Sequence, residues 1–408
     1  MSARRPLPWP LVALFTAGNL APYLLPTTVG RLDSGLPLSA TQAGAIGSAL
    51  LLSSATAGFL LASRVDRTGT RPLARLGLVL AFLGYGGAAL TTVVPAVVAG
   101  AVAGGFGSGT LTAVAVSGFA AHRDPHRVTT YGLLCVSALA GALYLTLPHL
   151  GPGHGLPLAA LALTALAVWP LTGRLAGPAV PDRSVAGERR LPHRRAGLLL
   201  AATMPCWSLA QNALWGVSGR LGLTQAHLTE VTVGAVFAVA LGAGLAGVAG
   251  AGALGTRLGR ALPIGGGTVL IAGCIALSAS ATDLPAFAGG EIAWNLFYPV
   301  VQTYVICLAA SLDPRGRWAV FVGSACSLGT AAGPLTGSLL AERAGYPVMG
   351  EVLALVLLLT AVPLAAVALR AGRRLLPVVD VPVEAPAAAV RSAYDTASPN
   401  WYASTSAR

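Results

Sequence analysis

The stretch A-S-R-V-D-R-T-G-T-R-P, residues 62–72, places four charged residues between two apolar runs. No charged residue occurs in the run before it, residues 40–61, or in the run after it, residues 76–93. An α-helix needs about 20 residues to cross the hydrocarbon core of a bilayer, and both runs are close to this length. The charges therefore predict a short polar turn between two membrane-spanning helices.

Composition extends this interpretation to the whole chain. Apolar residues make up 55% of the 408 positions and charged residues only 10%, which leaves too few polar side chains to cover a soluble protein. The apolar runs are far longer than the alternating strands of an outer-membrane barrel. We therefore expect an all-α integral membrane protein with twelve transmembrane helices. The runs lie at roughly residues 9–29, 40–63, 74–93, 96–120, 129–148, 156–173, 196–218, 229–253, 262–281, 284–310, 318–340 and 348–369.

All 26 basic residues are arginine, and their positions predict the topology. If the N-terminus is cytoplasmic, every arginine except Arg31, Arg220 and Arg343 falls on the cytoplasmic side, in agreement with the positive-inside rule. The net charge of +12 is then a topology signal and not a nucleic-acid footprint, because the arginines are scattered over short segments. We expect both termini in the cytoplasm. Abundant Ala and Gly, with no lysine, suggest a bacterial cytoplasmic membrane.

A weak internal repeat divides the chain into two parallel halves. A shift of 190 positions aligns Gly44 with Gly234 and Arg67 with Arg257. The aligned residues keep their place relative to the apolar runs, so both halves of six runs enter the membrane in the same direction. The predicted units are a six-helix bundle at 1–173, a cytoplasmic linker at 174–195, a six-helix bundle at 196–370 and a disordered cytoplasmic tail at 371–408.

The opening stretch resembles a family signature. Its Asp66-Arg67-x-Gly69-x-Arg71 is similar to the G-x-x-x-D-R-x-G-R/K-R/K sequence of the major facilitator superfamily. The second half carries a partial copy, Gly252-x-x-x-Thr256-Arg257-Leu258-Gly259-Arg260. Ala62 replaces the first glycine of the first copy, and Thr256 replaces the aspartate of the second. The resemblance implies a transporter with two pseudo-symmetric six-helix bundles.

The same resemblance implies a conformational latch. An aspartate in a basic turn can pair with an arginine or with a helix N-terminus, and the pair would hold the halves together on the cytoplasmic side when the cavity opens outward. The alternative is that the arginines only fix the topology, which we favour for Arg64 and Arg75. The expected latch residues are Asp66, Arg67, Gly69, Arg71, Arg257, Gly259 and Arg260.

Polar and aromatic residues inside the spans predict a solute cavity. In the superfamily the first helix of each three-helix unit lines the cavity, which means spans one, four, seven and ten here. Pro22 and Pro26 are expected to interrupt span one. Spacings of three and four place the polar and aromatic residues of one span on a common stripe. The predicted cavity residues are Asn19, Trp207, Gln211, Asn212, Trp215, Trp294, Asn295, Tyr298 and Gln302.

Glu291 is the predicted proton carrier. It is a carboxyl within an apolar span, where ionisation is costly and a proton can be taken up and released. The alternative is a hydrated, structural glutamate one or two turns from the outer surface. The family's antiporter arginine in span four would fall on Ala101, which the shift of 190 aligns with Glu291. The antiporter sequence G-x-x-x-G-P-x-x-G occurs in span eleven, as Gly329 to Gly337, where close helix packing is expected.

These features favour a secondary transporter that exports a neutral or cationic amphiphile, a drug or a metabolite, in exchange for protons by alternating access. An uptake symporter for a neutral metabolite would use the same residues. An organic-anion carrier is disfavoured because no basic residue lies in the middle of a span, where it could meet a carboxylate or phosphate. A non-transporting receptor or scaffold is the alternative of a different class. No enzyme signature, cofactor or metal site is expected, and the expected partners of the monomer are the solute, protons and the lipid bilayer.

Overall fold

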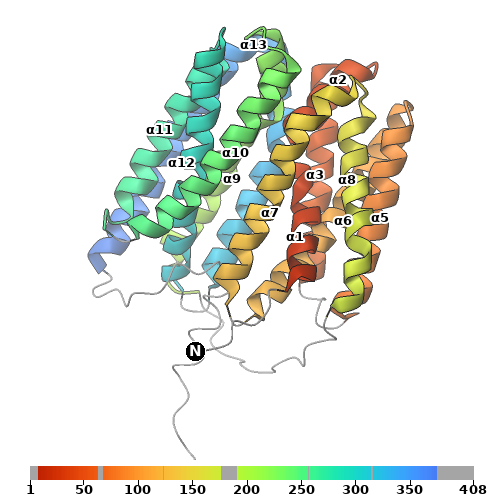
Figure 1. Cartoon of the computed structure of the whole chain (residues 1–408). Coiled ribbons are helices and arrows are strands. Elements are labelled where there is room, and N and C mark those ends of the chain that lie inside the picture. The colour runs from red at the N-terminus through yellow and green to blue at the C-terminus, as the bar shows by residue number, and fades with distance from the viewer. Residues whose placement is uncertain are drawn as a thin grey trace, which may run out of the picture.

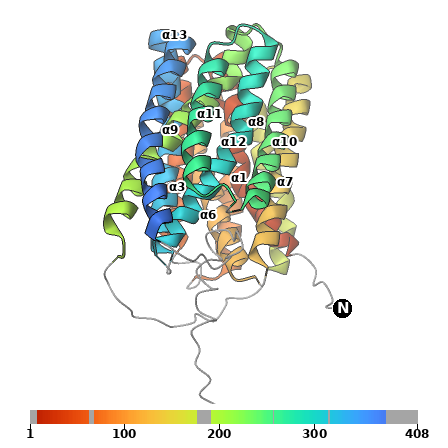
Figure 2. The same ribbon diagram turned by 90° about the vertical axis from the view of Figure 1, so that its left-hand side faces the viewer.

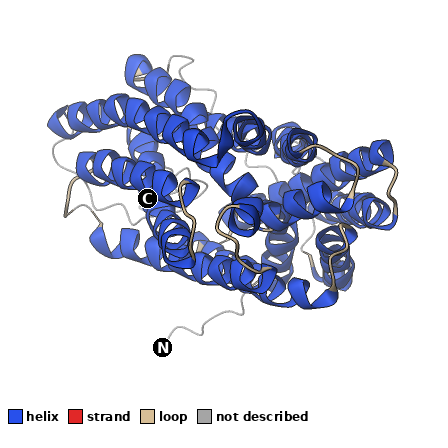
Figure 3. Ribbon diagram, turned by 90° about the horizontal axis from the view of Figure 1, so that it is seen from above, coloured by secondary structure: helices blue, strands red, loops and turns tan. Residues whose placement is uncertain are grey.

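The computed structural model describes residues 8–62, 68–122, 124–175, 191–255, 257–313 and 316–374, and all regular structure within these ranges is helical (Figures 1 and 3). The first helical group comprises α1 (Trp9–Tyr23), α2 (Leu25–Gly35), α3 (Ala40–Ala62), α5 (Thr70–Leu90), α6 (Val94–Ala120), α7 (Pro125–Thr146), η1 (Leu147–Leu150), α8 (Gly155–Val168) and η2 (Trp169–Arg174). The second helical group comprises α9 (Arg194–Thr224), α10 (Glu230–Leu254), α11 (Ala261–Ala279), α12 (Leu284–Ser311) and α13 (Arg317–Arg374).

Long apolar helices account for the architecture. Within the described ranges, nine helical segments are long and apolar enough to cross a membrane, so the chain is a multi-pass membrane protein. The helices run side by side along one direction, with the first group on the right of Figure 1 and most of the second group on its left (Figures 1 and 2). The expectation of an all-helical membrane protein is therefore confirmed.

The helix ends follow from local sequence. Asp124, Thr229 and Asp283 are N-cap residues whose side-chain oxygens accept hydrogen bonds from the main-chain N–H three residues ahead, at 3.2, 3.2 and 2.9 Å. At Gly345 the backbone has a φ of 80° and a ψ of 164°, which breaks α13 into two straight parts. Expected spans at 318–340 and 348–369 lie on the two sides of this break.

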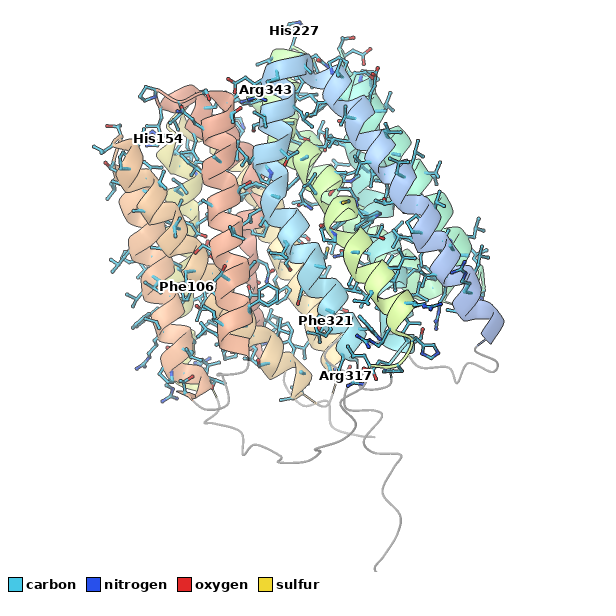
Figure 4. The ribbon with its side chains drawn as sticks, turned by 180° about the vertical axis from the view of Figure 1, so that it is seen from behind. Phe106, His154, His227, Arg317, Phe321 and Arg343 are labelled. Carbon is cyan, nitrogen blue, oxygen red and sulfur yellow. The ribbon has the colours of Figure 1, made fainter. Side chains whose placement is uncertain are left out.

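The two ends of the molecule are distinct faces. We call the end at which α1 begins the N-terminal face, and the end at which α2 finishes and α3 begins the opposite face. Figure 4 shows His154, His227 and Arg343 at the opposite face and Arg317 at the N-terminal face. The sequence predicted this separation of Arg343 from Arg317.

Two unit boundaries differ slightly from those predicted. The last two residues of the expected linker, Arg194 and Arg195, belong to α9, and α13 continues to Arg374, four residues into the expected tail. Arginine is a good helix former, so each helix extends beyond its apolar run. Residues 176–190 of the linker and 375–408 of the tail lie outside the described residues.

Glycines allow the closest contacts between helices. A Cβ atom added at Gly329, Gly333 or Gly337 of α13 would lie 2.1–2.6 Å from main-chain atoms of α9, so only glycine permits this approach. The expectation of close helix packing at the G-x-x-x-G-P-x-x-G sequence is confirmed. Gly105 and Gly109 of α6 approach main-chain oxygens of α3 in the same way, at 2.3 and 2.0 Å.

Candidate functional site

A cavity of about 430 Å³ lies between the two helical groups. Its inner end is marked by Trp215 and Trp294, which lie well inside α9 and α12, and by Pro22, next to the point where α1 ends and α2 begins. Towards the N-terminal face its wall includes Thr129 and Gly252, each within about one turn of a helix end. The cavity therefore runs from the middle of the molecule almost to the N-terminal face.

Six of the nine predicted cavity residues form part of this wall: Asn212, Trp215, Trp294, Asn295, Tyr298 and Gln302. Asn19, Trp207 and Gln211 are not among the lining residues. Asn19 instead donates through Nδ2 to the Phe15 carbonyl at 2.9 Å and to Thr112 Oγ1 at 3.3 Å within the first group. Trp207 and Gln211 are fully buried behind the wall.

The sequence interpretation missed the contribution of α7. Thr130 and Ser137 are lining residues seven positions apart, a spacing that places them on one helical face. This polar pair could have indicated that span five lines the cavity. The prediction considered only the first helix of each three-helix unit and therefore left span five out. Span four contributes no residue to the described wall, because α6 is committed to glycine packing against α3 and α5.

Four aromatic rings form a continuous row beside the cavity. Trp207 stacks on Tyr298 with ring centroids 5.5 Å apart and planes inclined by 14°. Tyr298 is 5.8 Å from Trp294, and Trp294 is 5.5 Å from Trp215. Tyr298, Trp294 and Trp215 of this row line the cavity, and the buried Trp207 packs against Tyr298 behind the wall.

The indole N–H groups of the row are already used within the protein. Trp294 Nε1 donates to Gln211 Oε1 at 3.1 Å, and Gln211 Nε2 donates to the Trp207 carbonyl at 3.1 Å. Trp215 Nε1 donates to the Pro22 carbonyl at 3.0 Å. That carbonyl is available because its usual main-chain donor, four residues ahead, is Pro26, which has no N–H. The predicted interruption of span one is thus confirmed: it ends α1 at Tyr23 and receives a ring from the other group.

Glu291 is fully buried, about 10 Å along α12 from its start at the opposite face. Its Oε1 accepts hydrogen bonds from Ser218 of α9 at 2.7 Å and from Ser278 of α11 at 2.8 Å. Its Oε2 is buried and has no hydrogen-bond partner in the described structure. No salt bridge to Glu291 occurs among the described residues, so the carboxyl is held by neutral hydroxyls in an environment that penalises its charged form.

Two ion pairs join the helical groups at the opposite face. Arg31 of α2 contacts Glu230 of α10 at 2.9 Å, and Arg220 of α9 contacts Asp33 of α2 at 3.3 Å. Both arginines are buried. They also line a smaller cavity of about 170 Å³ with both acids. These pairs were not predicted, although Arg31 and Arg220 stood out as exceptions to the arginine pattern.

The hydrogen bonds between described residues of the two groups lie in the middle of the molecule or toward the opposite face. Besides the ion pairs and the Trp215 contact, the Leu335 main-chain N–H donates to Ser48 Oγ at 2.9 Å and the Thr41 N–H donates to Glu342 at 2.8 Å. The main cavity extends toward the other end. The cavity is therefore directed to the N-terminal face, and the two helical groups are joined at the opposite face.

The predicted latch is only partly described. Asp66 and Arg67 lie outside the described residues. Gly69 has a φ of 87° at the start of α5, and Arg71 donates to the Gly173 carbonyl within the first group. In the second copy, Arg257 lies in the turn after α10 and Gly259 has a φ of 64°. Arg260 donates to Ser311 at 2.7 Å within the second group.

No protein-family model matches the chain, and no curated protein matches it. Solved structures do match. The human organic anion transporter MFSD10 (TETRAN) has a TM-score of 0.63 at 18% identity and covers 88% of this chain and 100% of its own. The POT family transporter PepTSo has 0.68 at 12% identity, covering 90% and 98%. The xylose transporter XylE from E. coli, in an inward open conformation, has 0.68 at 12% identity, covering 94% and 98%. The chain has the fold of the major facilitator transporters.

Proposed function

We propose that the chain is a secondary transporter that moves a small organic solute across the bacterial cytoplasmic membrane by alternating access. One observation carries this proposal: a cavity between the two helical groups extends toward one face only, while ion pairs join the groups at the other face. A solute in this cavity can leave on one side alone until the groups rock. The fold shared with solved transporters supports the same conclusion.

Twelve crossings in two six-helix bundles account best for the helices. The nine candidate spans treat α13 as one segment, although its break at Gly345 separates two parts of membrane-spanning length. Helices α1 and α2 together form one further crossing, and α9 with its 31 residues forms another. The N-terminal face is then cytoplasmic by the positive-inside rule, with both termini on that side.

Glu291 is our candidate for proton coupling. A buried carboxyl held by two serines carries a proton at little cost, and its unpartnered Oε2 can receive one. On α12 it precedes the cavity residues Trp294 and Asn295 by about one turn, and Asn295 Nδ2 donates to its main-chain carbonyl at 3.0 Å. Solute and proton would therefore act on the same turn of one helix. Proton-coupled efflux of a neutral or cationic amphiphile is the function that we favour.

The chemistry of the cavity wall bears on the charge of the substrate. MFSD10 is an organic anion transporter, but no arginine lines the described wall of this chain's main cavity. An anion would lose its hydration there without receiving a cationic partner. Proton-coupled uptake of a neutral metabolite would use the same cavity and carboxyl, and the direction of transport decides between the two.

The test is a solute screen with the purified protein in liposomes under an imposed proton gradient. We expect accumulation of a neutral or cationic solute above its equilibrium level, and its collapse when the gradient is dissipated. Glu291→Gln should abolish accumulation but retain exchange of solute without a gradient. Glu351→Gln is the matched control, because Glu351 also lies on a membrane helix but is exposed. Absence of any flux would favour a receptor or scaffold instead.

A further inference from the structure

Two amide side chains in the wall of the main cavity present their oxygens as hydrogen-bond acceptors. Asn212 donates through Nδ2 to the Ser208 carbonyl at 2.8 Å and to Thr330 Oγ1 at 3.3 Å. Asn295 donates through Nδ2 to the Glu291 carbonyl at 3.0 Å. A carbonyl can only accept, so these contacts fix which end of each amide is nitrogen. Both amide oxygens are left as acceptors in the cavity wall.

Prolines add main-chain acceptors in the same wall. Pro299 has no N–H to donate to the carbonyl of Asn295, four residues earlier, and Pro334 has none for the carbonyl of Thr330. Asn295 and Thr330 are both lining residues. Each therefore presents a carbonyl without its usual helical donor. Thr303, a further lining residue, uses its hydroxyl proton on the Pro299 carbonyl at 2.7 Å and keeps only acceptor capacity.

The remaining polar groups of the wall are neutral. The indole N–H groups of Trp215 and Trp294 are bonded to the Pro22 carbonyl and to Gln211. The Tyr298 hydroxyl, the Gln302 amide and the hydroxyls of other lining residues can donate as well as accept. No charged side chain belongs to the cavity wall in the described chain. A solute therefore meets fixed oxygen acceptors and adaptable neutral groups beside aromatic faces, which attract positive charge through the ring quadrupole.

We propose that the cavity selects solutes that carry N–H or O–H donors on an apolar or aromatic body, with protonated primary or secondary aryl-alkyl amines as the preferred class. The ammonium group would donate to the oxygens of Asn212 and Asn295, and the ring would lie against Trp215, Trp294 and Tyr298. Carboxylates and phosphates are disfavoured, because the described wall has no cationic side chain to replace their hydration. This inference rests on the proposed transport function for the identity of the cavity as the solute site.

A matched probe series tests the donor requirement. We would measure calorimetric binding of 2-(1-naphthyl)ethylammonium, its N,N,N-trimethyl analogue, 2-(1-naphthyl)ethanol and 3-(1-naphthyl)propanoate to the full chain in lipid nanodiscs. The trimethyl analogue keeps the charge but has no N–H. We expect it to bind about tenfold more weakly than the ammonium, because it loses charge-assisted hydrogen bonds. The alcohol should bind measurably and the carboxylate should not.

Two variants test whether the cavity wall causes the difference in affinity between the ammonium and trimethyl probes. Asn295→Leu should weaken binding of the ammonium by about tenfold and leave binding of the trimethyl analogue unchanged, since only the ammonium uses the amide oxygen. Asn19→Leu is the matched control: like that of Asn295, its amide donates to an i−4 carbonyl, but Asn19 lies outside the cavity wall. It should leave the ratio of the two affinities unchanged. Thermal unfolding of both variants establishes that each is folded.

Three results would overturn the inference: equal affinity for the ammonium and trimethyl probes, tight binding of the carboxylate, or no binding of any probe. The liposome screen separates these results from failure of the proposed function. A protein that accumulates another solute but binds none of the amines remains a transporter without the donor requirement. One that binds the amines as expected but moves no solute retains the donor requirement and loses the transport function.

Discussion

Neutralising Glu230 should open the closed face. In the structure Arg31 is almost fully buried and donates to the carbonyls of Leu147 and Gly151, at 3.0 and 2.8 Å, as well as to Glu230. Glu230→Gln removes the charge that crosses between the helical groups, while the carbonyl contacts keep Arg31 in place within the first group. The variant therefore weakens the closed face without leaving the arginine wholly unpartnered.

The size of the expected effect follows from the solvent exposure of the paired side chains. The Arg31 side chain is 5% exposed, but that of Glu230 is 41% exposed, so solvent screens the pair and its contribution is about 1 kcal/mol or less. A loss of this size raises the ratio of open to closed molecules by about fivefold. Asp33→Asn removes the second pair, whose carboxylate is 27% exposed, and should have an effect of similar size. If the two pairs act independently, the double variant should show about a 25-fold increase.

The assay is the labelling rate of a single introduced cysteine. Thr27 lines the smaller cavity behind the ion pairs, so Thr27→Cys in a background without the five native cysteines reports opening at this face. A membrane-impermeant maleimide should react about fivefold faster in Glu230→Gln. Asp283→Asn is the control, because Asp283 lies at the same face but caps α12 and joins no other helix in the described structure. Unchanged labelling in both Glu230→Gln and Asp33→Asn would refute the role of the ion pairs in closure.

Three further predictions concern coupling, packing and topology. Glu291→Gln should abolish gradient-driven accumulation in liposomes and preserve solute exchange, with Glu351→Gln behaving as the unmodified protein; a Glu291→Gln protein that still concentrates solute would contradict the proton-carrier assignment. Gly333→Ala should lower thermal stability by about 1–3 kcal/mol, because its Cβ would lie 2.6 Å from α9, whereas Gly323→Ala, with open space, should change little in the same unfolding assay. A cysteine at Gly153 should react with an impermeant reagent from outside intact cells; reaction only after permeabilisation would invert the topology.

The sequence predicted the spans well because bilayer thickness constrains every helix in the same way. The apolar run at residues 284–310 and helix α12 at 284–311 differ by one residue. Prediction was poorer where a polar residue extends a helix beyond its apolar run, as at Arg194. That outcome depends on local backbone geometry, to which a hydropathy pattern is insensitive.

The candidate site was predictable only in part, for a different physical reason. Periodicity identifies the face of a helix on which Trp294, Asn295 and Tyr298 lie, and the structure places all three in the cavity wall. It does not indicate whether a neighbouring helix covers that face. Gln211 is one helical turn before Trp215, a residue of the cavity wall, yet Gln211 is buried because it accepts from Trp294 and donates to Trp207. Contacts between helices distant in sequence decide such cases.

The internal repeat separates closure from coupling. Arg31 and Arg220 are 189 positions apart, close to the repeat shift, and each forms an ion pair with the other helical group at the same face. Each half thus contributes one arginine at a nearly equivalent position, although the acids that pair with them, Glu230 and Asp33, are not equivalent in the repeat. Glu291 aligns with Ala101, which is buried in α6 and cannot bind a proton. On our proposal, an arginine from each half holds the opposite face closed during the rocking cycle, and the carboxyl on one half alone gives that movement its dependence on the proton gradient.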